Sequence, residues 1–431
     1  MLRANDVGGW TKPAPRLYPH QWSWDSAFIA IGLAHLDPAR ALEELEHLFE
    51  AQWSDGRVPH IVFDPKVPDY WPGPELWGSR DVSAAPTTVA TSGLIQPPMH
   101  AIAVWRVLVI ARAEHVTEEQ RRALVARACA LYPKLLAWHR YLVERRDAER
   151  SGLITVYHPW EGTDNTPRWD AALARIEVGE IPPYPRTDVS LVDTAERPSK
   201  AEYDRYLWLV GLLRDLGYED ERIQRTHPFL IKDVQCSAIF VAANDALSQI
   251  AELAGAPAEE RSAIAEWSTR SAAAVRARWD YRLELALDLD LRAGGPIRCV
   301  TSAGLCPLLV PSLSREEARR FADRIFGPDF AGAEGLAFPV VLSTGARSPE
   351  FRPRAYWRGP AWPVINWLLW CGLRAHGLEP EAARLRDANL ALLARRGAQF
   401  AEYYEPFTAE PLGSPNQSWT AAVTLDWLAT G

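Results

Sequence analysis

The sequence predicts an all-α protein whose helices form two concentric layers within a single domain, residues 1–431. Two kinds of helix alternate: residues 37–50 have one apolar and one charged face, whereas residues 97–112 are apolar nearly all round. A one-faced helix fits an outer layer, and an all-apolar helix fits an inner layer that is covered on both sides. The same contrast recurs between residues 362–372 and residues 379–396. Strand-like runs are sparse, and no linker or repeat divides the chain, which favours one domain.

Local signals place the elements in chain order. Asp37 supplies an N-cap and Pro38 a first-turn proline for the helix at 37–50. Gly255 closes the helix at 235–254. Recurring apolar residues predict the remaining helices at 22–35, 117–146, 199–216, 257–280, 314–326 and 417–429. The best strand candidates are residues 152–157 (GLITVY) and 296–301 (PIRCVT).

Composition and charge exclude several classes of protein. With 47 Lys+Arg against 55 Asp+Glu the net charge is −8, which argues against nucleic acid or an anionic membrane as the main partner. No apolar run approaches the ~18 residues of a membrane span, and the N-terminal MLRANDVGGW lacks a signal-peptide core. The five cysteines are dispersed without a CxxC pair, so we expect neither disulfides nor a zinc site. These features predict a cytoplasmic protein. The sequence leaves open whether this protein forms a homo-oligomer.

Long loops carry the functional signal. Connections at 54–96, 157–198, 284–300 and 327–358 are rich in Pro, Gly and Trp, and loops longer than ~15 residues are uncommon unless functional. Nine of the 19 Trp lie in these loops or at adjoining helix starts: Trp22, Trp24, Trp71, Trp77, Trp160, Trp169, Trp357, Trp362 and Trp419. Aromatic faces cover the C–H faces of a sugar, while carboxylates and amides bind its hydroxyls, so these loops favour a saccharide pocket.

The sequence lacks the motifs of several common enzyme classes. GxGxxG, Walker, HExxH and GxSxG motifs are absent, and the ten His do not cluster with metal-ligand spacing, so no cofactor and no metal are expected. His158, in HPWEG, fits a hydrogen-bonding structural role better than metal ligation.

Carboxylates in aromatic loops remain as candidates. Asp164 lies in HPWEGTDNTPRWD (158–170), where nearby rings would raise its pKa and suit a general acid. In FAEYYEPFTAEPLGSPNQSW (400–419), Glu402, Glu405 and Glu410 compete, and the pattern alone does not choose among them. Two further clusters, HQWSWDSAF (20–28) and YWRGPAWP (356–363), hold Asp25 and Arg358, which could equally be a helix N-cap and a carboxylate partner.

These four clusters, in this order, resemble the inverting α-glycosidases that include trehalase and glycoside hydrolase family 63. EGTDNTPRW resembles the general-acid segment of that family, FAEYYEP followed by SW resembles its general-base segment, and QWSWDSAF and YWRGPAW resemble its sugar-site motifs. The compact length resembles the bacterial mannosylglycerate/glucosylglycerate hydrolases of the family. The resemblance implies an (α/α)6 barrel and inverting hydrolysis of mannosylglycerate or glucosylglycerate, with a small-molecule glycoside as partner. Thr408-Ala409 departs from the Thr-Gly of the family.

Roles for individual residues follow from the same resemblance. Asp164 becomes the general acid and Glu402 the general base, with carboxyls ~6.5–9.5 Å apart to admit a water. An anionic glycerate needs a cation, for which Arg197 is the candidate and Arg205 the rival. The predicted substrate-binding residues are Tyr18, Trp22, Trp24, Asp25, His60, Tyr70, Gln96, Arg197, Tyr203, Tyr356, Trp357, Arg358, Trp362 and Gln417. The alternatives are another inverting α-glucosidase or trehalase-like enzyme of this fold, or a non-catalytic carbohydrate-binding protein. The sequence does not separate mannose from glucose.

Overall fold

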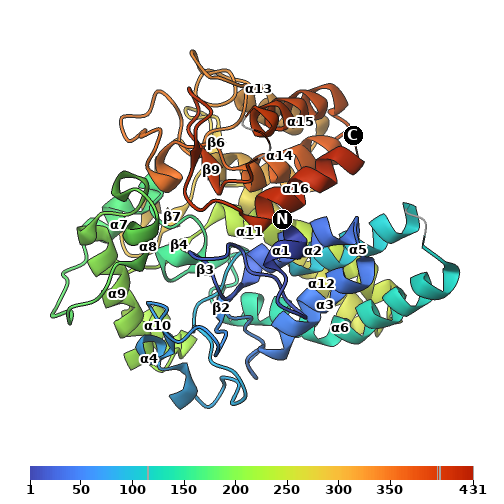
Figure 1. Ribbon diagram of the computed structural model, residues 1–431, viewed down its shortest axis with the longest axis horizontal. Coiled ribbons are helices and arrows are strands. Elements are labelled where there is room, and N and C mark those ends of the chain that lie inside the picture. Colours follow the sequence, from blue (N-terminus) through green and yellow to red (C-terminus); the bar gives the residue numbers. More distant parts are fainter. Residues whose placement is uncertain (114–115, 396, 398, 431) are drawn as a thin grey trace.

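The computed structural model describes residues 1–113, 116–395, 397 and 399–430. Within these ranges six segments form a closed inner ring in which each contacts the next and the last contacts the first (Figure 1). They are α2 (Ser23–Ala34), α5 (His100–Ala113), α11 (Val234–Leu253), the 3-10 helix η5 (Ser302–Leu309), α14 (Pro363–Ala375) and α16 (Ser418–Ala429). The chain therefore starts and finishes its ring with helices that pack directly on each other.

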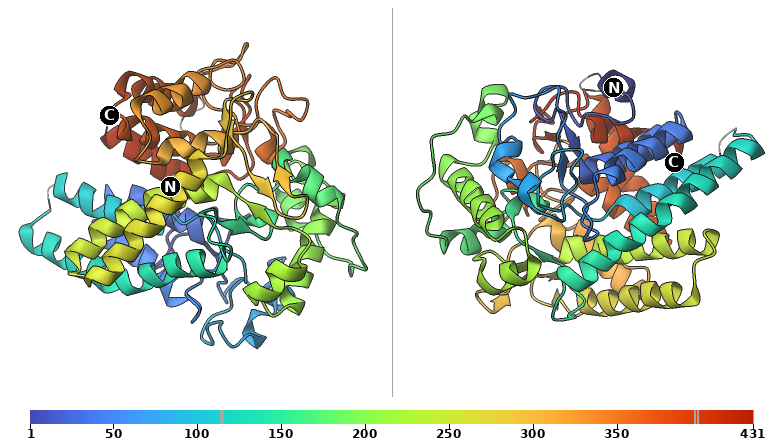
Figure 2. Two further views of the ribbon diagram at one scale, coloured as in Figure 1. Left: turned by 180° about the vertical axis from the view of Figure 1, so that it is seen from behind. Right: turned by 90° about the horizontal axis from the view of Figure 1, so that it is seen from below.

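An outer layer of helices surrounds this ring, and Figure 2 shows the two layers from behind and from below. It consists of α3 (Pro38–Glu50), α6 (Glu118–Arg145), α12 (Ala258–Arg276), α13 (Arg315–Ile325) and α15 (Glu379–Ala394). Each outer helix packs on an inner one: α3 on α2, α6 on α5, α12 on α11, α13 on η5 and α15 on α14. Behind α16 only the short α1 (Leu2–Asn5) makes an equivalent contact among the described elements. The arrangement is the predicted (α/α)6 barrel.

Burial explains why the two layers differ in sequence. All residues of α2 are buried, whereas α3 buries Leu42, Leu45 and Leu48 and leaves Glu50 exposed. Glu44 is the exception on α3, because its buried carboxylate accepts hydrogen bonds from Ser26 and Arg40. The predicted helices match those observed to within a few residues. The helix expected at 257–280 ends at Arg276, and residue 396, the predicted end of the helix at 379–396, lies outside the described residues.

Of the six segments of the inner ring, η5 is the one that the sequence did not predict. It is a 3-10 helix with Pro307 inside it, and all its residues are buried. Proline has no N–H to donate and disfavours an α-helical interior, so this short apolar stretch lacks the long helical pattern of its neighbours. The loop predicted at 284–300 also contains regular structure, because three two-residue strands lie in it or at its edge: β6 (Leu285–Ala286), β7 (Leu289–Asp290) and β8 (Gly295–Pro296).

Short antiparallel strands hold the long loops together. β1 (Gln21–Trp22) pairs with β2 (Ile61–Val62), and β9 (Tyr403–Tyr404) pairs with β10 (Pro411–Leu412). A four-stranded sheet has the order β3 (Thr155–Val156), β4 (Ile231–Lys232), β7, β8, and β5 (Trp279–Asp280) pairs with β6. The strand predicted at 152–157 is thus confirmed as β3, whereas only the first residue of the run predicted at 296–301 lies in a strand, β8.

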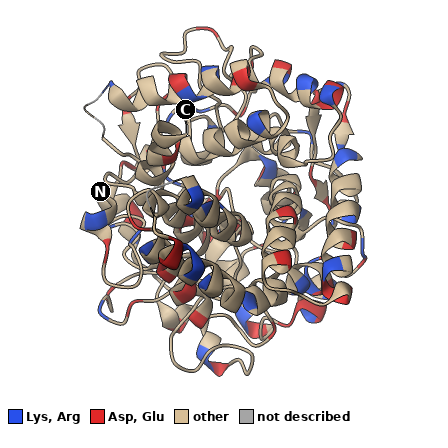
Figure 3. Ribbon diagram, turned by 90° about the vertical axis from the view of Figure 1, so that its right-hand side faces the viewer, with Lys and Arg blue, Asp and Glu red and all other residues tan. Residues whose placement is uncertain are grey.

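A lobe of shorter helices lies beside the barrel, on the left of Figure 1. It comprises α4 (Pro74–Trp77), α7 (Asp170–Ala174), α8 (Thr187–Leu191), α9 (Lys200–Asp215) and α10 (Asp220–Thr226). Single 3-10 turns complete the loops: η1 (Ser79–Asp81), η2 (Pro159–Glu161), η3 (Pro167–Trp169), η4 (Thr194–Glu196) and η6 (Tyr356–Arg358). Figure 3 shows charged residues on helices and loops alike. Among the described residues, no helix combines the length and apolar character that crossing a membrane requires.

Candidate active site

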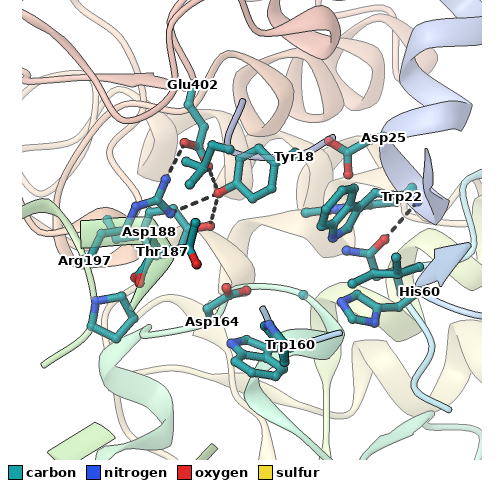
Figure 4. A pocket seen from close by; sticks show the side chains of 18 of the residues that line it. Tyr18, Trp22, Asp25, His60, Trp160, Asp164, Thr187, Asp188, Arg197 and Glu402 are labelled. Atoms are coloured by element: carbon teal, nitrogen blue, oxygen red, sulfur yellow. Dashed lines mark hydrogen bonds and ion pairs between the residues drawn. The ribbon is translucent and has the colours of Figure 1, made fainter. Parts of the chain in front are cut away.

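The long loops enclose a cavity of about 120 Å³ (Figure 4). At ~10–15 Å³ per water, this space holds about ten waters, the scale of a small sugar derivative. All but two of the residues predicted to act or bind line it: Tyr18, Trp22, Trp24, Asp25, His60, Tyr70, Gln96, Asp164, Arg197, Tyr203, Tyr356, Trp357, Glu402 and Gln417. Sequence positions almost 400 residues apart therefore meet at one site.

Asp164 faces the cavity from a loop that is fixed on both sides. The Arg168 guanidinium donates to the Thr163 hydroxyl (2.8 Å), and the Trp169 indole N–H donates to the Thr163 carbonyl (3.0 Å). Tyr206 donates to the carbonyl of Asp164 itself (3.1 Å). Desolvation, with a smaller contribution from the negative Glu402, raises the pKa of Asp164 to about 8 in spite of the nearby Arg197. This carboxyl is protonated at neutral pH and can donate a proton.

Glu402 is buried on the opposite wall, next to β9. Its Oε1 accepts from the Tyr18 hydroxyl (2.7 Å), and its Oε2 accepts from Arg197 Nη2 (3.0 Å) and the Ser414 N–H (2.9 Å). An ionised carboxylate has about four lone-pair positions, so three donors leave about one for a water. Arg197 Nη1 also donates to the Tyr18 oxygen (2.9 Å), which links the three side chains into one network (Figure 4).

The two rivals of Glu402 do not line the cavity. Glu405 closes a local turn, where its carboxylate accepts from the backbone N–H groups of Phe407 (2.9 Å) and Thr408 (2.6 Å). Glu410 forms an ion pair with Arg354 (2.6 Å). Of the three glutamates that the sequence pattern left open, Glu402 is therefore the one that lines the cavity.

Asp25 lies in the first turn of α2 and also faces the cavity. Desolvation raises its pKa well above the usual range, and the neighbouring Glu402 and Asp164 add to the effect. A carboxyl in this environment can either donate to or accept from a sugar hydroxyl.

Two predicted binding residues lie outside the cavity. Trp362 stacks on the far side of Trp357, with ring centroids 3.6 Å apart and planes at 3°, so Trp357 alone presents its face to the site. Arg358 forms a two-pronged ion pair with Asp170 (2.8 and 2.6 Å) and donates to the Asn165 carbonyl (3.2 Å). Neither side chain lines the cavity: Trp362 supports a lining ring, and Arg358 ties down the Asp164 loop.

Buried polar groups without a partner mark where a ligand would bind. The amide nitrogen and oxygen of Gln417 and the indole N–H groups of Trp419 and Trp71 have no hydrogen-bond partner among the described residues. All three side chains line the cavity. A buried unpaired donor or acceptor costs roughly 1–3 kcal/mol, so these groups favour a polar ligand rich in hydroxyls.

Sequence reasoning missed part of the wall: Leu17, Ile61, Trp71, Pro72, Trp77, Trp160, Gly162, Thr187, Asp188, Pro198 and Trp419. Four of these are loop tryptophans whose setting already indicated a pocket. Thr187 and Asp188 carried no comparable signal, because a single acidic residue in a polar loop is common.

His158 has the structural role expected of it. Its ring nitrogens lie 2.9 Å from the Trp160 N–H and 2.9 Å from the Tyr206 carbonyl oxygen. In the part of the chain that the structure describes, no group of three or more His, Cys, Asp or Glu could hold a metal ion.

Together, the barrel and the opposed carboxyls among aromatic rings define a glycoside hydrolase. A family model described as "Mannosylglycerate hydrolase MGH1-like glycoside hydrolase domain" matches residues 18–420, and the chain belongs to this family.

Similar proteins span almost the whole chain. The glucosylglycerate hydrolase of Mycolicibacterium hassiacum is 45% identical, covering 99% of this chain and 96% of that protein. The mannosylglycerate hydrolase of Thermus thermophilus is 42% identical, covering 99% and 98%. A crystal structure of the family 63 mannosylglycerate hydrolase from Thermus thermophilus, in complex with Tris and D-glycerate, superposes with a TM-score of 0.90 at 40% identity and covers 99% and 98% of the two chains.

Proposed function

We propose that this enzyme hydrolyses the α-glycosidic bond of glucosylglycerate, mannosylglycerate or both, with inversion, to give the sugar and glycerate. The observation that carries the proposal is that two carboxyls, Asp164 and the buried Glu402, line one cavity together with an arginine, Arg197. The raised pKa of Asp164 suits a general acid. The similarity to hydrolases of both substrates supports it.

In the proposed mechanism each carboxyl moves one proton. Asp164 gives its proton to the glycosidic oxygen, and the bond between this oxygen and the anomeric carbon breaks. A water attacks the anomeric carbon from the opposite face while Glu402 accepts its proton. Tyr18 and Arg197 hold the Glu402 carboxylate in one orientation, so its remaining lone pair is aimed at the water. Aromatic faces of the wall cover the sugar ring.

Arg197 is the proposed contact for the glycerate carboxylate. It is buried on the cavity wall, and its Nε has no hydrogen-bond partner among the described residues. Its rival Arg205 donates instead to the carbonyls of Leu173 and Ala201 (both 2.9 Å) and does not line the cavity. A charge-assisted hydrogen bond to an anion contributes roughly 1.5–3 kcal/mol, which a neutral aglycone cannot use.

The alternatives fit the site less well. A carbohydrate-binding protein needs no acid and base on opposite walls of its pocket. A trehalase-like enzyme has a neutral substrate, which would offer no anion to the unpartnered Nε of Arg197. Our proposal also includes a cytoplasmic location and a single catalytic domain, and the five free cysteines support the former.

One experiment tests the proposal directly. The enzyme is incubated with glucosylglycerate, mannosylglycerate and trehalose, and the released sugar is followed by NMR, which identifies both the sugar and its anomer. We expect rapid hydrolysis of at least one glycosylglycerate with the β-anomer appearing first. Preferential cleavage of trehalose would contradict the substrate, and initial release of the α-anomer would contradict inversion.

A further inference from the structure

Acidic side chains outnumber basic ones on the cavity wall. Four carboxyl side chains line it, those of Asp25, Asp164, Asp188 and Glu402, and among the lining residues Arg197 is the one Lys or Arg. Asp188 lies beside Arg197, on the side of the cavity where we place the glycerate (Figure 4). An unbalanced carboxylate there would repel the carboxylate of the substrate.

Arg186 balances this charge from behind the wall. Its Nε donates to Asp188 Oδ1 (2.8 Å) and its Nη2 to Asp188 Oδ2 (2.7 Å), a two-pronged pair. The Nη2 also donates to the Pro198 carbonyl (3.0 Å), and the guanidinium lies 4.1 Å from the centre of the Tyr203 ring. Asp188, Pro198 and Tyr203 all line the cavity, but Arg186 does not. One side chain outside the cavity thus contacts three residues of its wall.

We propose that Arg186 determines specificity for an anionic aglycone by neutralising Asp188. The inference rests on the proposed function, because it concerns how the glycerate end of that substrate is accepted. Arg186 is a positioning residue, since it acts through Asp188 and does not touch the substrate. A specific site excludes competitors as well as attracting its ligand, and here an unneutralised Asp188 would select against anions.

The pair differs from an ordinary surface ion pair. The side chains of Arg186 and Asp188 are 14% and 17% exposed, so water screens their charges only in part. Lys200 and Asp204, in the adjoining α9, form a pair of similar length (2.8 Å), but these side chains are 77% and 25% exposed and line no cavity. Lys200 therefore provides a matched control for the loss of one nearby positive charge.

The test compares glucosylglycerate or mannosylglycerate with the matching neutral glycoside, in which CH₂OH replaces the carboxylate. We expect Arg186→Gln to lower the charged-to-neutral ratio of kcat/KM about tenfold, mainly through KM for the charged substrate. Arg186→Lys, which keeps the charge, should stay within about threefold of the wild-type ratio. The double variant Arg186→Gln/Asp188→Asn should restore the ratio to within about threefold, and Lys200→Gln should leave it unchanged. Thermal unfolding checks that each variant is folded.

The outcomes separate this inference from the proposed function. If wild type cleaves a glycosylglycerate but Arg186→Gln slows both substrates equally, the inference is wrong and the proposed function stands. If the double variant fails to restore the ratio, Arg186 acts only as a mechanical tie to Pro198 and Tyr203, and the inference is again wrong. If wild type cleaves neither glycosylglycerate, the proposed function fails, and the inference fails with it.

Discussion

At the residue scale, Asp164 and Glu402, the proposed acid and base, lie in different surroundings. Asp164 has few donors and is desolvated, which favours its protonated form. Glu402 has three donors, including a guanidinium, which suit a carboxylate. This division of environments is what an acid and a base need if they are to act at the same pH.

Replacing either carboxyl should therefore remove most turnover. General acid–base assistance contributes ~10²–10⁴-fold per group, so we expect Asp164→Asn and Glu402→Gln each to lower kcat by at least about a hundredfold. Binding of the substrate, measured by calorimetry, should persist because neither change removes the aromatic wall. A variant that kept more than about a tenth of wild-type kcat would remove that residue from the mechanism.

The pKa of Asp164 also sets a pH dependence. The acid must be protonated to act, so kcat/KM, which reports the free enzyme, should be level near neutral pH and fall once the pH exceeds about 8. In the unfolded chain the same carboxyl ionises near pH ~4. Between these values the unfolded state binds fewer protons than the folded state, so the stability contributed by Asp164 is lost as the pH rises.

Urea unfolding at several pH values tests whether the stability contributed by Asp164 falls as the pH rises. The free energy of unfolding of wild type, minus that of Asp164→Asn, should decrease from pH ~4 to ~8 and then level off. A difference that stayed level or rose over this interval would show that Asp164 is ionised in the folded enzyme.

Motifs identified which residues belong near the site but not which way they face. Trp357 and Trp362 lie in the same short segment, and only the stacked geometry reveals that one covers the other. Arg358 pairs with Asp170, which is the carboxylate-partner alternative that the sequence left open. Side-chain direction in an irregular loop depends on neighbours from other loops, which no local pattern records.

At the scale of elements, the β9–β10 hairpin positions Glu402, the proposed base. The Glu402 N–H donates to the Ser414 carbonyl (2.9 Å), and the Ser414 N–H donates to the Glu402 carboxylate (2.9 Å). Gly413, next to Ser414, has a φ of +68°. A Cβ at Gly413 would lie 2.6 Å from Glu402 Oε2. Glycine is thus required both by the backbone conformation and by the closeness of the carboxylate.

We expect Gly413→Ala to displace the Glu402 carboxylate and lower kcat roughly 10–100-fold, because small misplacements of a reacting group are costly. Gly294→Ala is the matched control, since Gly294 has a φ of +73° and a Cβ added there would meet no heavy atom within 4 Å. Both variants should lose about 1–2 kcal/mol of stability from backbone strain. Gly413→Ala should lose more than Gly294→Ala, because its Cβ would also lie 2.5 Å from the Tyr403 ring. Equal kcat values for the two variants, measured on the same substrate, would contradict the role given to Gly413.

Long helices were predictable because their pattern extends over several turns, as α3 and α6 show. The two-residue strands and η5 were not, since they are too short to show a period and are held by tertiary contacts. The same limit hid α8, whose first turn contributes Thr187 and Asp188 to the site.

At the scale of the whole molecule, the ring closes where α16 meets α2. A Cβ on Gly32 would lie 2.4 Å from the Cα of Ala422, so the two helices touch through their backbones at this point. Closure therefore depends on a residue without a side chain.

Gly32→Ala should push α2 and α16 apart and destabilise the protein by ~1–3 kcal/mol, as overpacking of a core does. Gly211→Ala is the control, because Gly211 lies inside α9 with no heavy atom near its Cβ position and should gain ~0.5–1 kcal/mol of stability. Urea denaturation measures both. A Gly32→Ala variant as stable as wild type would mean that the helix contact adjusts without cost.

The closure of the ring by α2 and α16 also has a consequence for the nascent chain. The helix that seals α2 is α16, and it is translated almost 400 residues after its partner. Until α16 is made, the apolar face of α2 that it will cover is exposed in the nascent chain. Exposed apolar faces promote aggregation and recruit chaperones. Glu402, the proposed base, and Gln417 are translated shortly before α16. A nascent chain that stalled before residue 402 would thus lack both the proposed base and the helix that covers α2, so it would be inactive and prone to aggregate.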